Sequence, residues 1–189
     1  MVLTTNFIKT IAAYILHWYQ SGTARNYSIV NHQGNTVTFD ILQSLSSMSQ
    51  QDTDTKLLYL CLYNASPSGN AIASDVVSTG GGGGSFIAVG SGSTEATKDD
   101  YTLESPITSL TVSSYTFGAT AEGVQYTSVM TNPTDSDVVI REIGIFEKMN
   151  IHSAYLPAHC CMWGREVLDT PITLEPGQTA TFTAELTFV

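Results

Sequence analysis

The clearest pattern of hydrophobic and polar positions lies at the end of the chain, where Thr179–Val189 alternates without interruption. The polar face carries Thr179, Thr181, Thr183, Glu185 and Thr187, and the apolar face carries Ala180, Phe182, Ala184, Leu186 and Phe188. A period of two places alternate side chains on opposite faces of an extended chain. The segment therefore predicts a strand with one buried face and one solvated face.

Similar short segments recur upstream at intervals that are typical of an all-β domain. They are Tyr27–Val30, Thr36–Leu42, Lys56–Tyr63, Phe86–Val89, Ile107–Ser113, Val124–Thr131, Asp137–Glu147 and, approximately, Met162–Leu168. Turn-forming residues separate them: Gly34 lies in a predicted hairpin loop, and Asn132–Asp137 and Leu174–Thr179 predict hairpin-type turns. About eight to ten short strands predict a mainly β protein, an antiparallel β-sandwich of jelly-roll-like type.

The exception to the β pattern is an apolar segment near the N-terminus that has helical spacing. Its side chains at three- and four-residue steps are Phe7, Ile11, Tyr14, Ile15 and Trp18. Thr4, Thr5 or Asn6 can cap the first turn, and Gly22 can end the helix. The sequence therefore predicts one N-terminal α-helix.

This helix is apolar on nearly all sides, so most of its surface must be covered. It either packs across the open end of the sandwich or docks into a neighbouring subunit. On the second interpretation, the predicted interface residues are Phe7, Ile11, Tyr14, Ile15 and Trp18.

The resulting domain prediction is an N-terminal helix at 1–24, followed by a single β-sandwich domain at 25–189. Within this domain, 64–85 predicts a flexible loop because it contains five consecutive glycines, Gly80–Gly84. Polyglycine loses the most conformational entropy on ordering. A phosphate-binding loop would need a lysine and a Ser or Thr after the glycines, opening a helix. The segment that follows, Ser85–Val89, has the character of a strand instead.

The composition favours strands and a weakly charged surface. Only 13% of the 189 residues are charged, and 25 Thr and 20 Ser supply most of the polarity. The formal net charge is −10. An acidic chain repels nucleic acid and anionic membranes, so neither is an expected partner. A polar surface with few charges suits packing against copies of itself.

The cysteines and the N-terminus give information about the compartment. Cys61, Cys160 and Cys161 are odd in number and have no repeated spacing, which predicts free thiols in a reducing cytoplasm rather than a disulfide framework. The apolar segment Phe7–Tyr19 is shorter than the ~20 residues that cross a bilayer. It also lacks the basic start and the cleavage site of a signal peptide.

Several residue groups are candidates for metal binding or catalysis. His152, His159, Cys160 and Cys161 could ligate zinc, but they lack the usual paired spacing. Acid pairs that could bind calcium are Asp52/Asp54, Asp99/Asp100 and Asp135/Asp137, although short acids in loops commonly bond their own backbone. The sequence contains no Gly-x-Ser-x-Gly nucleophile motif. We therefore predict no catalytic residue, no metal site and no cofactor.

Arg141 and Glu142 lie inside an otherwise apolar strand segment. On a regular strand they face opposite ways, so each needs its own partner unless a bulge near Gly144 intervenes. Either an inter-subunit salt bridge or an exposed or intramolecular charge would satisfy them.

Four segments, in this order, resemble virion structural proteins of tailed bacteriophages. The first begins near Asn6–Phe7, and the second combines VGSGST at Val89–Thr94 with DDYTLESPI at Asp99–Ile107. The third is VVIREIGIFEK at Val138–Lys148, and the fourth is Arg165–Val189. The resemblance covers about Phe86–Val189 and, more weakly, the front of the chain. The segment Asn150–Gly164 departs from it, since such proteins often have a short turn there.

The resemblance implies a non-enzymatic tail, tail-fibre, baseplate, neck or capsid-decoration β-domain. Such a protein would be made in the host cytoplasm, would self-associate into a homo-oligomer and would dock onto other virion proteins. The alternative from another class is a receptor- or glycan-binding tip module, in which exposed aromatic residues such as Tyr155 or Trp163 would contact the sugar.

Overall fold

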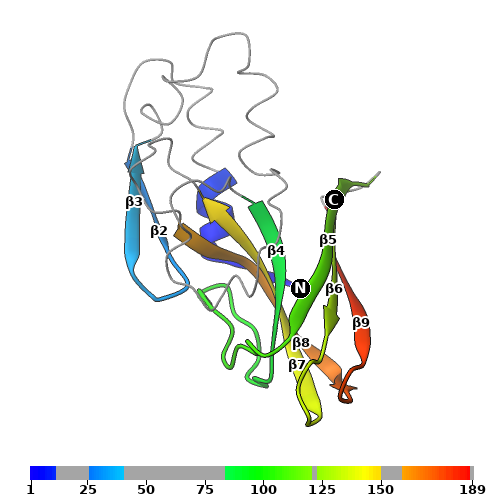
Figure 1. Cartoon of the computed structure of the whole chain (residues 1–189). Helices are drawn as coiled ribbons and strands as arrows, with labels where there is room; N and C mark the ends of the chain where they lie inside the picture. The colour runs from blue at the N-terminus through cyan, green and yellow to red at the C-terminus, as the bar shows by residue number, and fades with distance from the viewer. Residues whose placement is uncertain (12–25, 41–83, 121–122, 150–158, 188–189) are drawn as a thin grey trace.

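The computed structural model describes residues 1–11, 26–40, 84–120, 123–149 and 159–187. In this part of the chain the strands run in the order shown in Figure 1. They are β1 (Val2–Leu3), β2 (Asn26–Val30), β3 (Thr36–Asp40), β4 (Gly84–Gly90), β5 (Thr111–Ala119), β6 (Gly123–Thr131), β7 (Val138–Met149), β8 (His159–Leu174) and β9 (Thr179–Thr187). One short helix covers residues 5–11. The prediction of a mainly β protein with an N-terminal helix is confirmed.

The strands form two antiparallel sheets and a separate hairpin. One sheet has the order β1-β8-β7-β4, the other has the order β5-β6-β9, and β2 pairs with β3. Apolar side chains of both sheets meet in one core, which contains Ile140, Ile145 and Trp163 from the first sheet and Tyr126 and Phe182 from the second. This is a sandwich arrangement, and the jelly-roll-like connectivity stays a prediction.

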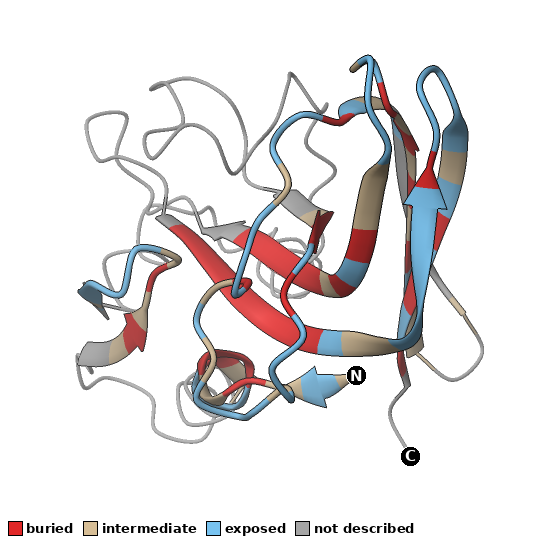
Figure 2. Ribbon diagram, turned by 90° about the horizontal axis from the view of Figure 1, so that it is seen from below, coloured by how far each residue is buried: buried red, intermediate tan, exposed pale blue. Residues whose placement is uncertain are grey.

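The four-stranded sheet is buried on both faces along its middle (Figure 2). The face away from the main core carries a second cluster with Ala88, Phe146, Cys160 and Met162, and Leu103 comes from the segment that follows β4. The loop between β4 and β5 therefore covers this face of the sheet.

The C-terminal strand follows its sequence pattern. Phe182, Ala184 and Leu186 of β9 are buried, whereas the intervening Thr183 and Glu185 are exposed. The register between β6 and β9 runs from Thr131↔Thr179 to Gly123↔Thr187 without a shift. The predicted alternation of a buried and a solvated face is confirmed.

The two predicted hairpin-type turns at 132–137 and 174–179 are wrong in one respect. Each joins strands of different sheets, because β7 and β8 belong to the four-stranded sheet and β6 and β9 to the other. Asn132 lies between them and is fully buried. Its side-chain Nδ2 donates to the backbone carbonyls of Ser136 and Leu174, both at 2.8 Å, and its backbone carbonyl accepts the N–H of Gly177 at 2.7 Å. Local turn chemistry is the same for a hairpin and for a crossing between sheets, so the sequence did not distinguish them.

Other boundaries differ from expectation. The strand predicted at Ile107–Ser113 lies at Thr111–Ala119, since the preceding residues are used to cover β4. The hairpin around Gly34 is confirmed, and Gly34 has a φ of 82°. The predicted strand Lys56–Tyr63 and the glycine-rich loop up to Gly83 lie outside the described residues.

The N-terminal residues belong to the sandwich itself. Val2 and Leu3 pair with β8, and Thr4 caps the helix, with its Oγ1 accepting the N–H of Phe7 at 3.4 Å. Asn6 binds the hairpin by donating to the carbonyl of Val30 at 2.6 Å and accepting its N–H at 2.8 Å. The first residues thus connect the hairpin to the four-stranded sheet.

We expect Asn132→Ala to lower the free energy of unfolding by about 2–4 kcal/mol, because it leaves the buried Leu174 carbonyl without its donor. Urea unfolding measures the change. Thr131→Ala is the matched control, since it removes only an exposed hydroxyl contact with Thr179, and it should cost less than about 1 kcal/mol. Equal effects of the two substitutions would contradict the role given to Asn132.

Candidate functional site

The most extensive polar site in the described residues is centred on Glu142 of β7, a carboxylate with no exposed surface. Its Oε1 accepts the N–H groups of Gly92 at 3.0 Å and Ser105 at 2.8 Å. Its Oε2 accepts the N–H of Glu104 at 3.1 Å and the Nε–H of Arg165 at 2.8 Å. Four donors thus saturate the carboxylate, which is what a buried charge requires.

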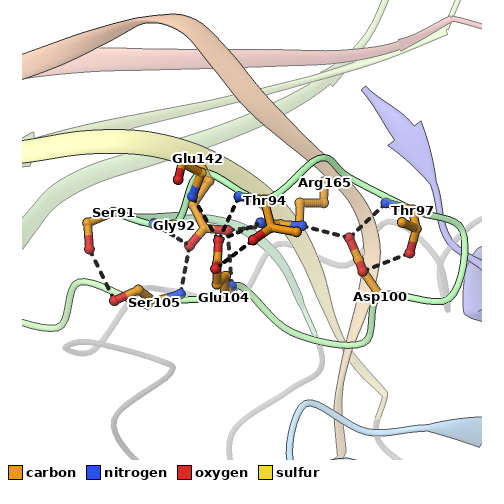
Figure 3. Close-up of polar contacts among 10 residues, drawn as sticks. Ser91, Gly92, Thr94, Thr97, Asp100, Glu104, Ser105, Glu142 and Arg165 are labelled. Carbon is orange, nitrogen blue, oxygen red and sulfur yellow. Dashed lines mark hydrogen bonds and ion pairs between the residues drawn. The ribbon is translucent and has the colours of Figure 1, made fainter.

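Arg165 of β8 is the cation of this site and is only 3% exposed. Besides Glu142, it binds Asp100, with Nη1 2.9 Å from Oδ2. Its Nη2 lies 3.7 Å from Oε2 of Glu104. We call Asp100, Glu104, Glu142 and Arg165 the Glu142 cluster (Figure 3).

Three carboxylates surround one guanidinium, and backbone amides balance the excess negative charge. Glu104 accepts the N–H groups of Ser93 at 2.7 Å and Thr94 at 2.8 Å, as well as the Thr94 hydroxyl at 2.7 Å. Asp100 accepts both the N–H and the hydroxyl of Thr97, each at 2.9 Å. Such oriented amide groups stabilise anions without a formal charge.

Two glycines let the backbone approach this carboxylate. A Cβ on Gly90 would lie 2.3 Å from Oε1 of Glu142, and one on Gly92 would lie 2.6 Å from the same atom. Any larger residue at either position would displace the carboxylate or the chain. The Gly-x-Gly of the VGSGST segment is thus explained by close approach to Glu142, and neither residue has a positive φ.

The strand register brings the charges together. Glu142 pairs with Val167, and Arg165 lies opposite Gly144, so the two side chains come from diagonal positions, offset by two residues, on neighbouring strands. A register shift between Ile140 and Glu142 separates the exposed Arg141 from the buried Glu142. The strand is therefore not regular at this point, and the partner of Glu142 lies within the same chain.

The electrostatics agree with a structural ion network. Burial alone would lower the pKa of Arg165, but its bonds to Asp100 and Glu142 outweigh burial and raise the pKa. Burial opposes ionisation of Asp100, yet the donors on Thr97 and Arg165 lower its pKa. The pKa of Glu104 is lowered, mainly by the N–H and hydroxyl of Thr94. All three groups are therefore charged near neutral pH.

The arrangement holds the loop between β4 and β5 against the sheet. Each carboxylate of the Glu142 cluster is engaged by backbone donors and by Arg165. The thiol of Cys161 is also unreactive, because burial, together with the nearby Glu147, raises its pKa to about 12. A nucleophilic cysteine needs the opposite shift.

The predicted interface residues are only partly within the described chain. Phe7 is 7% exposed and packs edge-on against Trp163, with ring centroids 5.3 Å apart. Ile11 is partly buried against the same core. Tyr14, Ile15 and Trp18 lie outside the described residues. The described turns of the helix therefore pack on the sandwich of their own chain.

The residues considered for other chemistry are also dispersed. Cys160 lies in the second apolar cluster, Cys161 is a buried free thiol, and His152 and Cys61 lie outside the described residues. Among the residues the structure describes, no three His, Cys, Asp or Glu are placed to hold a metal ion. Trp163, considered for glycan contact, is a core residue with 3% exposure.

Sequence reasoning missed the partnership of Arg165, Glu104 and Asp100 with Glu142. The signal was present, since Glu142 and Arg165 each interrupt an apolar segment and each needs a partner. The pairing itself depends on the register of β7 and β8, which the sequence did not provide.

Comparison with known proteins adds no relative. No protein-family model matches the chain, and no curated protein and no solved structure matches it significantly. In the part of the chain that the structure describes, no helix has the length and hydropathy needed to cross a membrane.

We expect Arg165→Met to lower the free energy of unfolding by about 3–5 kcal/mol, because it leaves the buried Glu142 without its cation. Adding Glu142→Gln should cost less than the sum of the two single substitutions, since the buried charge is then absent. A double-mutant cycle by urea unfolding measures this coupling. Arg141→Met is the matched control at an exposed position and should change stability by less than about 0.5 kcal/mol. Strict additivity would contradict the pairing.

The lowered pKa of Glu104 predicts a stability that depends on pH. A carboxyl whose folded-state pKa lies below its ordinary value of 4.5 stabilises the fold above that pH. The contribution is lost as the pH falls through the lowered value. The difference in unfolding free energy between the wild type and Glu104→Gln should therefore shrink on acidification from pH 7 to pH 3. A difference that stays constant over this range would count against the loop contact.

Proposed function

We propose that this chain is a structural protein of a tailed-bacteriophage virion. In this role it is not an enzyme: it self-associates and docks onto other tail, neck or capsid proteins. It is made in the host cytoplasm and is incorporated into the virion.

The observation that carries the proposal is the convergence of three of the four resembling segments. The second segment contributes Gly92, Asp100 and Glu104, the third Glu142, and the fourth Arg165, and all of them meet in the Glu142 cluster. Thr5, just before the first segment, donates its N–H to the carbonyl of Lys98 in the same loop at 2.7 Å. Residues that carry a resemblance and also form one framework support a shared architecture.

The chemistry of the site supports a structural role. Its charges are neutralised by partners within the chain, so they hold the loop in place and are not presented to a substrate. The exposed face of β6 and β9 bears hydroxyl pairs such as Thr131–Thr179, 2.8 Å apart. A surface of this type carries little charge that would repel a neighbouring subunit.

Mass spectrometry of purified particles tests the location. We expect peptides of this chain in virions of the phage that encodes it, in amounts comparable to those of known structural proteins. A non-structural phage protein made in the same infected cells serves as the control and should be absent from the particles. Abundant chain in infected cells together with its absence from purified virions would contradict the proposal.

A further inference from the structure

The strand β9 forms one edge of its sheet. In the order β5-β6-β9 it pairs with β6 on one side, and no other described strand pairs with it on the other. An edge strand presents unpaired backbone N–H and C=O groups that can accept another strand.

The hydrogen-bond alternation shows which residues carry these groups. Paired positions that exchange bonds alternate with positions that do not. The N–H of Asn132 donates to the carbonyl of Gln178 at 2.9 Å, next to the pair Thr131↔Thr179. By alternation, Ala180 and Phe182 bond to β6. The groups that point away from β6 belong to Thr179, Thr181, Thr183 and Glu185.

These outward positions are open to solvent. Thr179, Thr181, Thr183 and Glu185 are all exposed in the folded chain. Natural edge strands are usually protected by proline, lysine, a bulge or a covering loop. Thr179–Thr187 contains neither proline nor lysine, and its register with β6 has no shift.

The edge strand β4, in contrast, is covered by another segment of the chain. There the carbonyl of Val89 accepts the N–H of Ile107 at 2.9 Å, and Gly90 forms a bridge with Pro106. The loop that the Glu142 cluster holds therefore covers the β4 edge, whereas the described residues leave β9 open.

We propose that two copies of this chain join through β9, antiparallel and edge to edge, so that their sheets continue across a two-fold axis. The inference rests on the self-association in the proposed function. An alternating row of N–H and C=O groups is complementary to another extended strand, and identical antiparallel strands satisfy each other around such an axis.

Charge selects a second copy as the occupant. The chain carries a net charge of −10, yet Glu185 is the only charged residue of β9. In the register centred on Phe182, Thr181 lies opposite the second copy's Thr183, and Glu185 lies opposite its Thr179. No like charges then face each other, and the hydroxyl ladder of β6 and β9 continues into the second copy.

Amide hydrogen exchange of the wild-type chain tests this directly. The N–H groups of Thr181 and Thr183 have no partner on β6, so they exchange fast in a monomer. We expect them to become protected at high concentration, in step with dimer formation measured by light scattering. A wild-type chain that stays monomeric would overturn the inference. A dimer in which both amides still exchange fast would overturn the β9 contact but leave self-association standing.

Charge variants give an independent measurement. Thr181→Lys with Thr183→Lys places lysines opposite lysines in this register, so this double variant should be monomeric. The corresponding double glutamate variant should also be monomeric, and mixing the two should restore a dimer. Restoration shows that both variants are folded.

The matched control is Thr127→Lys with Thr131→Lys, which adds the same charge to the neighbouring strand β6 and should leave the dimer intact. Dimers of the double lysine variant that persist unchanged would overturn the proposal. Virion mass spectrometry is unaffected by these results, so failure of the β9 contact can be told apart from failure of the virion assignment.

Discussion

The buried charge of Glu142 determines how the covered side of the four-stranded sheet is built. A carboxylate with no contact to water must be saturated by donors, and here three of the four are backbone N–H groups of Gly92, Glu104 and Ser105. These groups come from both arms of the loop between β4 and β5. One side chain therefore fixes two chain segments against the sheet, and Leu103 between them is placed in the second apolar cluster.

Arg165 makes this arrangement cooperative. Its guanidinium binds Glu142 at Nε and Asp100 at Nη1, so the central strands and the far arm of the loop share one cation. Lysine has a single ammonium group and could not offer this planar set of donors. Because the loop also bonds to Thr5 and to β4, its position affects both the N-terminal segment and one edge of the sheet.

The fold class was accessible from sequence because it depends on local periodicity. The alternation of Thr179–Leu186 and the helical spacing around Phe7 are properties of neighbouring residues, and both were correctly interpreted. The Glu142 cluster is non-local: Asp100 and Arg165 are 65 positions apart along the chain and meet only after the strands have paired. The same reason explains why the sequence predicts hairpin turns at Asn132 and Gly177. The local chemistry of a turn does not reveal which sheet the next strand joins.

The sheet edges at β4 and β9 differ in whether another described segment of the chain covers them. At β4, the segment around Pro106 pairs with the edge strand. The Glu142 cluster anchors that segment by several charge-assisted hydrogen bonds. At β9, the register with β6 has no shift, and the outward residues are polar, with Glu185 the one charged residue among them. Leaving such an edge open carries a risk of uncontrolled pairing, which natural proteins normally prevent. The described residues cover the edge at β4 and leave the edge at β9 open. Pairing of identical strands around a two-fold axis, as proposed for β9, is a closed contact that stops at two copies.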